Sequence, residues 1–338
     1  MSESTAPRTV GELGEFALID RINAGRVQAP AVLLGPGDDA ALVAAPDGRF
    51  VVTTDMLVQG RHFRLDWSSP RDIGRKAIAQ NAADVVAMGA VPTAFVVALG
   101  CPAETPLEVV DGIADGLWAE AAHAGGSIAG GDLVRSEDIV LSITAFGDLR
   151  GLAPLLRSGA RVGDTIAVAG RLGWSAAGLA VLSAGADIER FADVVAAHRV
   201  PQPPYAAVLD VVHGGAVART GTPHALTDIS DGLLADLGHI ASASGVRIDL
   251  DSAALRDPFL ETIARGLDAD AAQWILAGGE EHAFAAAWPC DVTLPVGWQR
   301  IGRVFAGHGV TVDGAVRPGS GGWESFGGAD SAVSAEPR

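Results

Sequence analysis

Aspartates next to glycines, threonines or apolar segments recur along this chain. They occur in five short motifs: Gly35-Pro36-Gly37-Asp38-Asp39, Thr53-Thr54-Asp55, Asn81-Ala82-Ala83-Asp84, Gly130-Gly131-Asp132 and Asp228-Ile229-Ser230-Asp231-Gly232. Hard cations such as magnesium prefer oxygen ligands and are usually held by one or two carboxylates together with substrate phosphates. Glycines let the backbone approach such a ligand closely. The motifs therefore predict carboxylates from several loops that hold magnesium against phosphate groups.

Each motif also has a simpler explanation when it is taken alone. Asp38-Asp39 could form a plain turn after Gly-Pro-Gly, and Ser230-Asp231 could cap the helix that follows. Asp84 could be a solvent-facing helix residue. Asp55, however, follows the apolar segment Phe50–Val52, and a carboxylate at the inner end of a buried strand is costly unless it is paired or bound to metal. Five such motifs together favour the metal site.

Sequence motifs of several common catalytic sites are absent. The chain has no G-x-x-x-x-G-K-[ST] segment and no set of protein-kinase motifs,. The segment Gly173–Gly178 resembles a nucleophile elbow but is one residue too long, so we interpret it as a glycine turn that enters a helix. The histidines lack zinc-protease spacing, and Cys101 and Cys290 stand far apart, which argues against a zinc site or a disulfide framework.

Charge and hydropathy narrow the classes of partner. The chain has 41 acidic and 24 basic residues, for a formal net charge of −17, and it has no Lys/Arg run. This composition argues against nucleic acid as a partner. It is compatible with phosphate substrates if divalent cations lie between carboxylates and phosphates. No apolar segment approaches the roughly 20 residues that span a bilayer, and the polar N-terminus does not resemble a signal peptide. We therefore expect a soluble, cytoplasmic protein with no membrane partner.

Apolar periodicity predicts helices and strands in mixed order. The expected helices are Glu12–Ile22, Asp72–Met88, Leu107–Ala122, one from Ser175, Tyr205–Val212, one from Ser230, and Ala269–Ala277. The expected strands are Val32–Leu34, Phe50–Thr54, Thr93–Leu99, Ile139–Phe146, Thr165–Ala169, Ala225–Thr227, Val246–Leu250, Ala283–Trp288 and Arg300–Phe305. Because strict β-α-β alternation is missing, the order favours an α+β fold. A break around Arg157–Asp164 divides it into domains 1–150 and 151–338.

The motifs, in this order, resemble those of the thiamine-monophosphate kinases, a family in the superfamily of aminoimidazole ribonucleotide synthetase. The most specific segments are Gly37–Ala41, Thr54–Val58 with Gly60 and His62-Phe63, Asn81–Pro92, Gly130–Asp132, Arg157–Ala160, Asp228–Leu233 and Gly278–Glu280. The resemblance implies an N-terminal mixed sheet with helices and a C-terminal α/β domain. It also implies a homodimer built through the N-terminal domains, with the N-terminal domain holding metal and ATP and the C-terminal domain completing the ATP and substrate sites.

The activity implied by the resemblance is transfer of a phosphoryl group from ATP to thiamine monophosphate, assisted by several Mg²⁺ ions. The implied metal ligands are Asp39, Thr53, Thr54, Asp55, Asp84, Asp132, Asp228 and Asp231. The implied ATP contacts are Gly131, Asp132, Arg157 and Ser230, and the implied thiamine contacts are His62, Glu280 and Phe326. Asp55, Asp132 and Arg157 would take part most directly in the transfer. Asp38 is a weaker candidate than Asp39.

Some positions differ from the family pattern, and two other functions stay open. Glu281-His282 follows Glu280 where Asp-Tyr is common, Leu133 replaces a common Thr, and Ala83 replaces a common Ser. Another ATP-using enzyme of the superfamily, similar to aminoimidazole ribonucleotide synthetase, is one alternative. A non-catalytic module that binds magnesium and nucleotide is the other.

Overall fold

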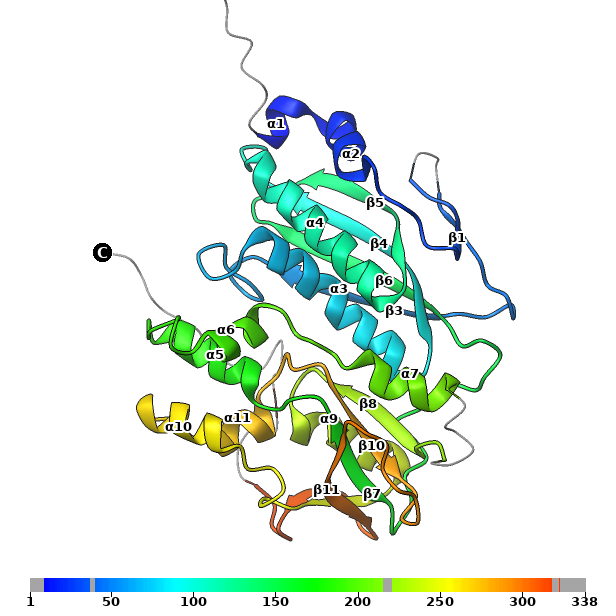
Figure 1. Ribbon diagram of the computed structural model, residues 1–338, viewed down its shortest axis with the longest axis vertical. Coiled ribbons are helices and arrows are strands. Elements are labelled where there is room, and N and C mark those ends of the chain that lie inside the picture. Colours follow the sequence, from blue (N-terminus) through cyan, green and yellow to red (C-terminus); the bar gives the residue numbers. More distant parts are fainter. Residues whose placement is uncertain (1–8, 37–39, 215–220, 318–321, 323–338) are drawn as a thin grey trace, which may run out of the picture. The chain divides into compact units, whose positions relative to one another are not determined.

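The computed structural model describes residues 9–36, 40–214, 221–317 and 322. The chain forms two compact units, Met1–Pro154 and Leu155–Arg338, and each is considered by itself (Figure 1). Within the described residues, no helix combines the length and the apolar character needed to cross a bilayer.

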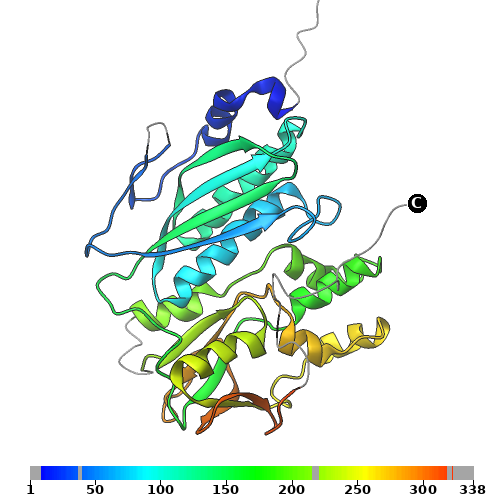
Figure 2. The ribbon, with the colours of Figure 1, turned by 180° about the vertical axis from the view of Figure 1, so that it is seen from behind.

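The first unit is built on a four-stranded sheet in the order β3-β6-β4-β5. The strands are β3 (Val51–Val58), β4 (Val91–Cys101), β5 (Ser127–Arg135) and β6 (Val140–Asp148). The neighbours of β6 are antiparallel to it, whereas β4 and β5 are parallel and joined through a helix. Helices α3 (Pro70–Ala87) and α4 (Leu107–Ala124) cover one face of the sheet (Figure 1). The view from behind shows the other face, across which no helix lies among the described residues of this unit (Figure 2).

Helices α3 and α4 pack closely because glycines occupy their crossing points. A Cβ atom added at Gly74 would overlap the carbonyl oxygen of Ile113, and one at Gly116 would overlap that of Arg71. Helix α3 begins with a capping box formed by Ser69 and Asp72, which satisfies two backbone N–H groups at the helix start. The local sequence thus fixes where α3 begins, and the glycines set how near α4 can lie.

The N-terminal segment differs from its prediction. Instead of one helix over Glu12–Ile22, it forms α1 (Val10–Leu13) and α2 (Glu15–Asn23), separated at Gly14, where φ is +83°. In α2, Phe16 is 80% exposed, whereas Leu18 is buried. A two-stranded sheet of β1 (Val32–Leu34) and β2 (Leu42–Val43) follows.

The second unit contains a six-stranded sheet in the order β12-β9-β11-β7-β10-β8. Its strands are β7 (Thr165–Ala169), β8 (Ala225–Ile229), β9 (Arg247–Leu250), β10 (Ala283–Trp288), β11 (Trp298–Phe305) and β12 (Gly309–Val312). Its helices are α5 (Trp174–Ser183), α6 (Ala192–Arg199), α7 (Tyr205–His213), α9 (Leu233–Ser244), α10 (Pro258–Gly266) and α11 (Ala271–Ala277). All strand pairs are antiparallel except β12 with β9. The mixed sheets and helices confirm the predicted α+β class.

The core of this unit explains why strands β7, β8 and β10 are largely apolar. Ile166 on β7, Ile248 on β9 and Leu237 on α9 belong to one buried cluster. Strands β7, β8 and β10 are buried along their whole length, and Thr227 and Asp228 of β8 are among their few polar residues. The carboxyl end of β8 and the start of β10 therefore present the functional loops.

Candidate functional site

Strand β3 does not end where the sequence analysis placed its end. It continues through Asp55 to Val58 and is the edge strand of its sheet. Val52 is 53% exposed and Phe50 is 54% exposed. The expectation that Asp55 terminates a buried strand is therefore wrong. Asp55 is half-buried in the middle of an exposed edge strand.

Helix α3 brings Asn81 and Asp84 against Thr53 and Asp55 of β3. Thr53 Oγ1 donates a hydrogen bond of 2.8 Å to Asp84 Oδ2. The backbone N–H of Asp55 donates to Asn81 Oδ1 at 2.9 Å, and Asn81 Nδ2 donates to Ala77 O. Because side chains alternate along a strand, Thr53 and Asp55 share the face toward α3. Thr53, Asp55 and Asp84 can therefore offer oxygens from one side of the sheet.

Two other predicted ligands of this unit lie on the opposite face of the sheet. Thr54 Oγ1 donates to Ile143 O at 2.8 Å, away from Asp84. The strand registers place Asp132 in one cross-strand row with Ala98, Ser142 and Met56, and residues in such a row share a face. Within this unit, the side chains of Thr54 and Asp132 are therefore not brought together with those of Asp55 and Asp84.

Gly131 and Asp132 lie in β5, an element that the sequence analysis did not predict. A Cβ atom at Gly131 would overlap the carbonyl oxygen of Val97, so only glycine fits there. Asp132 is exposed, and its Oδ1 accepts a hydrogen bond from the backbone N–H of Leu133 at 3.0 Å. The pair thus combines a close backbone approach with an exposed carboxylate.

His62 is held in the turn that follows β3. The backbone N–H of Val58 donates to His62 Nδ1 at 3.0 Å, and Lys76 Nζ donates to the carbonyl oxygen of His62 at 3.0 Å. Accepting a hydrogen bond at Nδ1 favours the neutral tautomer with its proton on Nε2. His62 can therefore present an Nε2–H donor.

In the second unit, the predicted residues gather at the carboxyl end of β8. Asp228 is buried, and its Oδ2 lies 3.2 Å from His282 Nδ1. Burial and the charge of Asp228 raise the pKa of Asp231. Helix α9 begins after Gly232, its N-cap residue, so the alternative in which Ser230-Asp231 caps this helix is wrong. The end of β8 and the following turn thus hold two interacting carboxylates.

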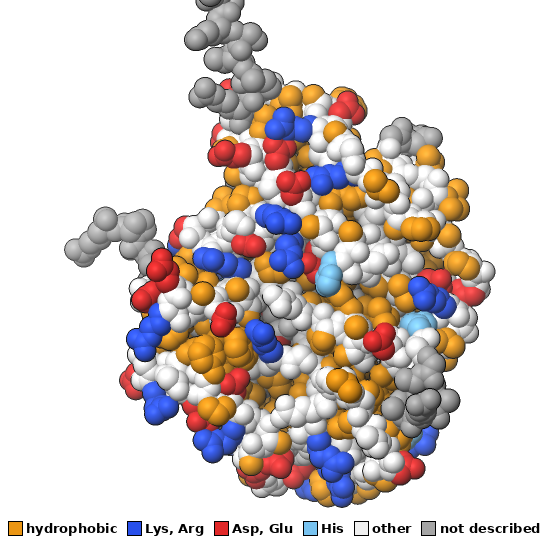
Figure 3. Space-filling view, in the orientation of Figure 1, with side chains coloured by type: hydrophobic (Ala, Val, Ile, Leu, Met, Phe, Trp, Pro, Cys, Tyr) orange, Lys and Arg blue, Asp and Glu red, His pale blue; other side chains and the backbone are white. Residues whose placement is uncertain are grey.

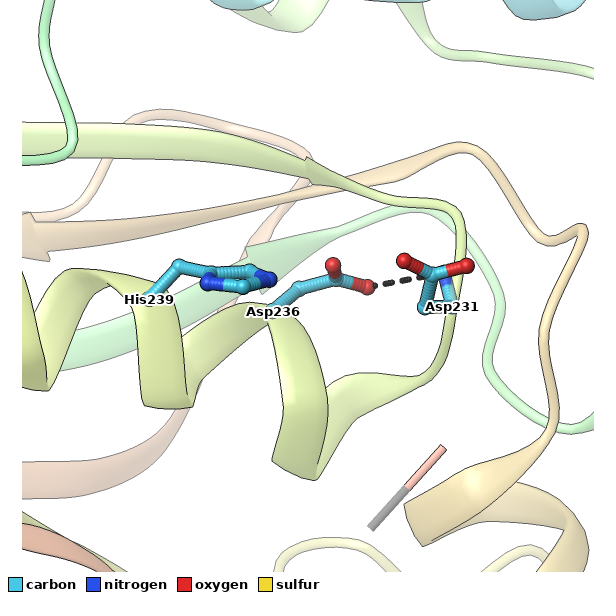
Figure 4. Close-up of side chains that lie close together, drawn as sticks. All are labelled: Asp231, Asp236 and His239. Carbon is cyan, nitrogen blue, oxygen red and sulfur yellow. Dashed lines mark hydrogen bonds between the residues drawn. The ribbon is translucent and has the colours of Figure 1, made fainter. Parts of the chain in front are cut away.

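Sequence reasoning missed two further residues of this cluster. Asp236 Oδ2 accepts hydrogen bonds from the backbone N–H groups of Asp231 and Gly232, both at 3.1 Å. Figure 4 shows Asp236 between Asp231 and His239, and possible ligand atoms of these three lie within 4.8 Å of one another. Burial, then the charge of Asp228, raises the pKa of Asp236 to about 7. The signal was present as acidic and imidazole side chains three residues apart on one helix face.

Arg157 and Glu280 approach the same strand end. Arg157 Nε donates to Thr227 Oγ1 at 3.2 Å, next to Asp228, and its charge lowers the pKa of Asp231 against the larger effects of burial and Asp228. The backbone N–H of Glu280 donates to Ser230 O at 2.7 Å. The structure therefore brings these two residues together with Asp228, Ser230 and Asp231.

Three candidate site residues, Asp38, Asp39 and Phe326, lie outside the described residues. In the first unit, Thr53, Asp55 and Asp84 form one group of hydroxyl and carboxylate oxygens, whereas Thr54 and Asp132 lie on the other face of the sheet. In the second unit, the remaining candidates gather at the end of β8. This second group combines carboxylates with an arginine and a glutamate. Carboxylates with raised pKa values next to an arginine are suited to binding a divalent cation and an anion together.

Comparisons with known proteins agree along nearly the whole chain. Residues 37–149 match the family described as AIR synthase related protein, N-terminal domain, and residues 161–314 match AIR synthase related protein, C-terminal domain. The thiamine-monophosphate kinase of Mycobacterium tuberculosis (strain ATCC 25618 / H37Rv) is 56% identical over 330 residues, which cover 96% of this chain and 96% of that protein.

Solved structures give the same result. The thiamine-monophosphate kinase from Stenotrophomonas maltophilia K279a matches with a TM-score of 0.76 and 35% identity, covering 89% of this chain and 97% of that one. A structure of AaThiL complexed with AMPPCP and TMP matches with a TM-score of 0.74 and 30% identity, covering 96% of this chain and 100% of that one.

Proposed function

The chain belongs to the AIR synthase-related family and, within it, to the thiamine-monophosphate kinases, and from this premise we propose that it converts thiamine monophosphate and ATP to thiamine diphosphate and ADP. The observation that carries the proposal is the 56% identity to a protein of that name over 96% of both chains. The complex of AaThiL with AMPPCP and TMP supports the two substrates, because AMPPCP is an ATP analogue. The enzyme is a phosphotransferase with a phosphate group as acceptor.

The carboxylate groups fit a requirement for Mg²⁺. Asp231 and Asp236 have raised pKa values because they are buried near Asp228, and a bound cation would relieve this repulsion. In the second unit we propose Asp228 and Asp231 as ligands, and in the first Asp39, Thr53, Asp55, Asp84 and Asp132. Asp132 lies on the sheet face opposite to Asp55 and Asp84, so in this proposal it does not share an ion with them within one unit. Magnesium, when bound, supplies positive charge that neutralises the phosphates. The bond from Thr54 Oγ1 to Ile143 O argues against a role for the Thr54 hydroxyl, so Thr54 is the weakest of these candidates.

The chain's own residues would mainly bind and orient the two phosphates. Phosphoryl transfer depends on in-line positioning and charge stabilisation more than on covalent chemistry. The acceptor oxygen of thiamine monophosphate is already ionised at neutral pH, so a general base is unnecessary. Arg157 would contribute a permanent cation beside the phosphates. Gly131 and Ser230 would contact ATP through the backbone and hydroxyl, respectively.

We propose His62, Glu280 and Phe326 as contacts of the thiamine part of the acceptor. His62 can donate from Nε2, and Glu280 is one-third exposed in a loop tied to Ser230. A carboxylate near the positively charged thiazolium ring of thiamine would favour it electrostatically. Phe326 would stack on a flat ring.

The helix-free face of the first unit's sheet, part of which is covered by β1 and β2, supports a homodimer. Val52, Met56 and Val134 on this face are 53%, 53% and 54% exposed. Burial of apolar surface contributes roughly 25 cal/mol per Å², so a second copy of the chain could cover this face favourably. We propose a cytoplasmic homodimer, in line with the use of ATP.

The distribution of charge also bears on how anionic substrates are held. On the face of the described residues drawn in Figure 3, basic side chains are dispersed among acidic ones. Such a surface supports binding of phosphates through metal ions and a few placed arginines rather than through a basic patch.

The proposal is tested by product formation. The purified chain is incubated with ATP, MgCl₂ and thiamine monophosphate, and thiamine diphosphate is quantified by chromatography. Stoichiometric ADP and thiamine diphosphate are expected. If a folded chain that binds AMPPCP forms no product, the kinase proposal fails and a non-catalytic nucleotide-binding module becomes the better explanation. Turnover only with the substrate of aminoimidazole ribonucleotide synthetase would favour the other enzyme.

A further inference from the structure

The loop Gly278–His282, called here the glutamate loop, has a backbone that most side chains disfavour. Glu280 and His282 have φ values of +64° and +51°, in the left-handed region. For residues other than glycine this region costs of order 1 kcal/mol or more each. Such a conformation persists only when surrounding contacts hold it. The contacts of this loop therefore indicate what keeps Glu280 in place.

The backbone of the loop is tied to the end of β8. The N–H of Glu280 donates to Ser230 O at 2.7 Å, and the N–H of His282 donates to Ile229 O at 2.8 Å. A Cβ atom at Gly279 would lie 2.7 Å from Ser230 O, so glycine is needed for this close approach. These bonds hold the backbone of the loop against β8. Contacts of the loop's side chains can then stabilise the left-handed conformation of Glu280 and His282.

The residue that follows Glu280 anchors the loop to helix α5. Glu281 is 8% exposed, and its Oε1 accepts a hydrogen bond from the backbone N–H of Ser175 at 2.8 Å. Ser175 lies in the first turn of α5, where N–H groups lack partners within the helix. An oxygen acceptor is favoured there because it pairs with such an N–H group, and also because the helix dipole is positive at this end. Glu281 thus connects the two left-handed residues to a rigid element.

A second contact reaches Glu280 itself from helix α6. His198 is 7% exposed, and its Nδ1 lies 3.3 Å from Ser175 Oγ and 3.7 Å from Glu280 Oε2. Ser175 therefore lies next to both anchors, through its N–H to Glu281 and through its hydroxyl to His198. Both contacts use the same nitrogen of His198, so this is not the arrangement of a hydrolase triad, which needs both ring nitrogens.

We propose that Glu281 and His198 are positioning residues that hold Glu280 in the orientation required to bind the thiamine substrate. This inference rests on the proposed function, in which Glu280 contacts thiamine monophosphate. Neither residue contacts the substrate in this proposal. Glu281 acts through the backbone of the loop, and His198 acts through the carboxylate of Glu280.

The test compares Glu281→Ala with Glu281→Gln. Alanine removes the acceptor for the Ser175 N–H, whereas glutamine keeps an acceptor oxygen at the same distance along the side chain. We expect Glu281→Ala to raise the KM for thiamine monophosphate at least ten-fold, with the KM for ATP changed less than two-fold. Glu281→Gln should restore most of the affinity. His198→Gln, which leaves the loop anchor intact, should raise the same KM by a smaller factor.

Asp251→Ala is the matched control. Asp251 Oδ1 accepts from the backbone N–H groups of Ala253 and Ala254, so its removal also deprives backbone donors of a carboxylate, but away from the glutamate loop. It should leave both KM values unchanged. Equal effects of Glu281→Ala on the two KM values, or equal effects of Glu281→Ala and Asp251→Ala, would overturn the proposal.

Hydrogen exchange gives a readout that does not depend on activity. In Glu281→Ala the amide protons of Glu280 and His282 should exchange at least ten-fold faster than in the parent chain, and in Asp251→Ala they should not. Unchanged exchange would contradict the anchoring role even if turnover falls. If the parent chain forms no thiamine diphosphate, the proposed function fails, and the exchange rates still decide whether Glu281 holds the loop.

Discussion

Asp231 is the residue at which metal dependence is best tested in the second unit. It is half-buried and has a raised pKa, chiefly from burial and then from Asp228. Asp231→Asn removes the charge but keeps the shape. We expect turnover to fall about 100-fold or more, a loss of roughly 3 kcal/mol in transition-state stabilisation, and the magnesium concentration at half-maximal rate to rise. Kinetic titration with MgCl₂ measures both.

The matched control is Asp210→Asn, an exposed aspartate on α7. It should leave the rate and the magnesium dependence within two-fold of the parent values. A normal magnesium titration for Asp231→Asn would remove Asp231 from the proposed ligands.

Glu281 should make stability depend on pH. Burial raises its pKa to about 8 from an ordinary value of 4.5, against a smaller lowering by the N–H groups of Ser175 and Ala176. The folded chain therefore keeps a proton that the unfolded chain releases, so stability falls as pH rises from about 4.5 to about 8. The neighbouring titratable groups are His198, Glu280 and His282. The amide of Glu281→Gln does not titrate in this range, so this variant should not show the fall in stability.

Urea unfolding of both proteins at pH 5.5 and pH 8 checks the sign. The stability of Glu281→Gln relative to the parent should rise between these values by up to about 3 kcal/mol, since one pKa unit corresponds to about 1.4 kcal/mol. Parallel stability curves would mean that the buried carboxyl titrates at an ordinary pH.

At the scale of elements, the crossing of α3 and α4 depends on glycine. Gly116→Ala places a Cβ atom onto the carbonyl oxygen of Arg71 and near the backbone of Arg75. The helices cannot separate without disturbing the contact of α3 with β3, so we expect a loss of about 2–4 kcal/mol in the free energy of unfolding. A shift of α3 should also lower activity, because Asp84 and Asn81 lie on this helix and contact β3.

Gly238→Ala on α9 serves as the control, because nothing lies within 4 Å of the added Cβ atom. Alanine has the higher helix propensity, so this change should be neutral or should stabilise by up to about 1 kcal/mol. Chemical denaturation compares the two variants. A Gly116→Ala protein as stable as Gly238→Ala would show that the interface is not close-packed.

The sequence predicted elements well where the pattern was long and bounded by local signals. The predicted helix Asp72–Met88 corresponds to α3 (Pro70–Ala87), which a capping box begins. Strand β5 was missed because Gly130 and Gly131 interrupt its apolar pattern,. Its pairing with β4 joins residues that are about 33 positions apart in the sequence, as in Ala94 with Ser127. Helices α6 and α10 were also missed, although the N-cap Asp257 and the following Pro258 mark the start of α10,. The order of strands in the sheets could not be deduced, since β10 pairs with β7 and β8, both distant in sequence.

The same limit applies to the candidate site. Motif spacing could indicate that Asp228 and Asp231 lie together, because they are three residues apart at the end of one strand. It could not separate Thr53 from Thr54, since the face of each residue depends on the register of β3 against β6,. It also could not reveal that Glu281 binds the start of α5, because 106 residues separate Glu281 from Ser175.

At the scale of the whole molecule, a net charge of −17 has to be reconciled with two anionic substrates. Repulsion between the chain and free ATP would slow association. Magnesium bound with the nucleotide reduces this repulsion, and the grouped carboxylates then become attractive rather than repulsive. The acidity of the chain is therefore consistent with the proposed substrates only in the presence of divalent cations.

The exposed part of the helix-free sheet face in the first unit leads to a prediction about assembly. A homodimer formed through this face would bury Met56, which is 53% exposed in the single chain. Met56→Glu would place a charge in the interface without a partner, at a cost of several kcal/mol. We expect sedimentation equilibrium to show a dimer for the parent chain and a dimer dissociation constant at least 100-fold higher for Met56→Glu.

Val296→Glu is the control. It lies at a position that is fully exposed in the second unit and should remain dimeric. A parent chain that is monomeric at micromolar concentration, or a dimer that tolerates Met56→Glu, would mean that this face is not the interface.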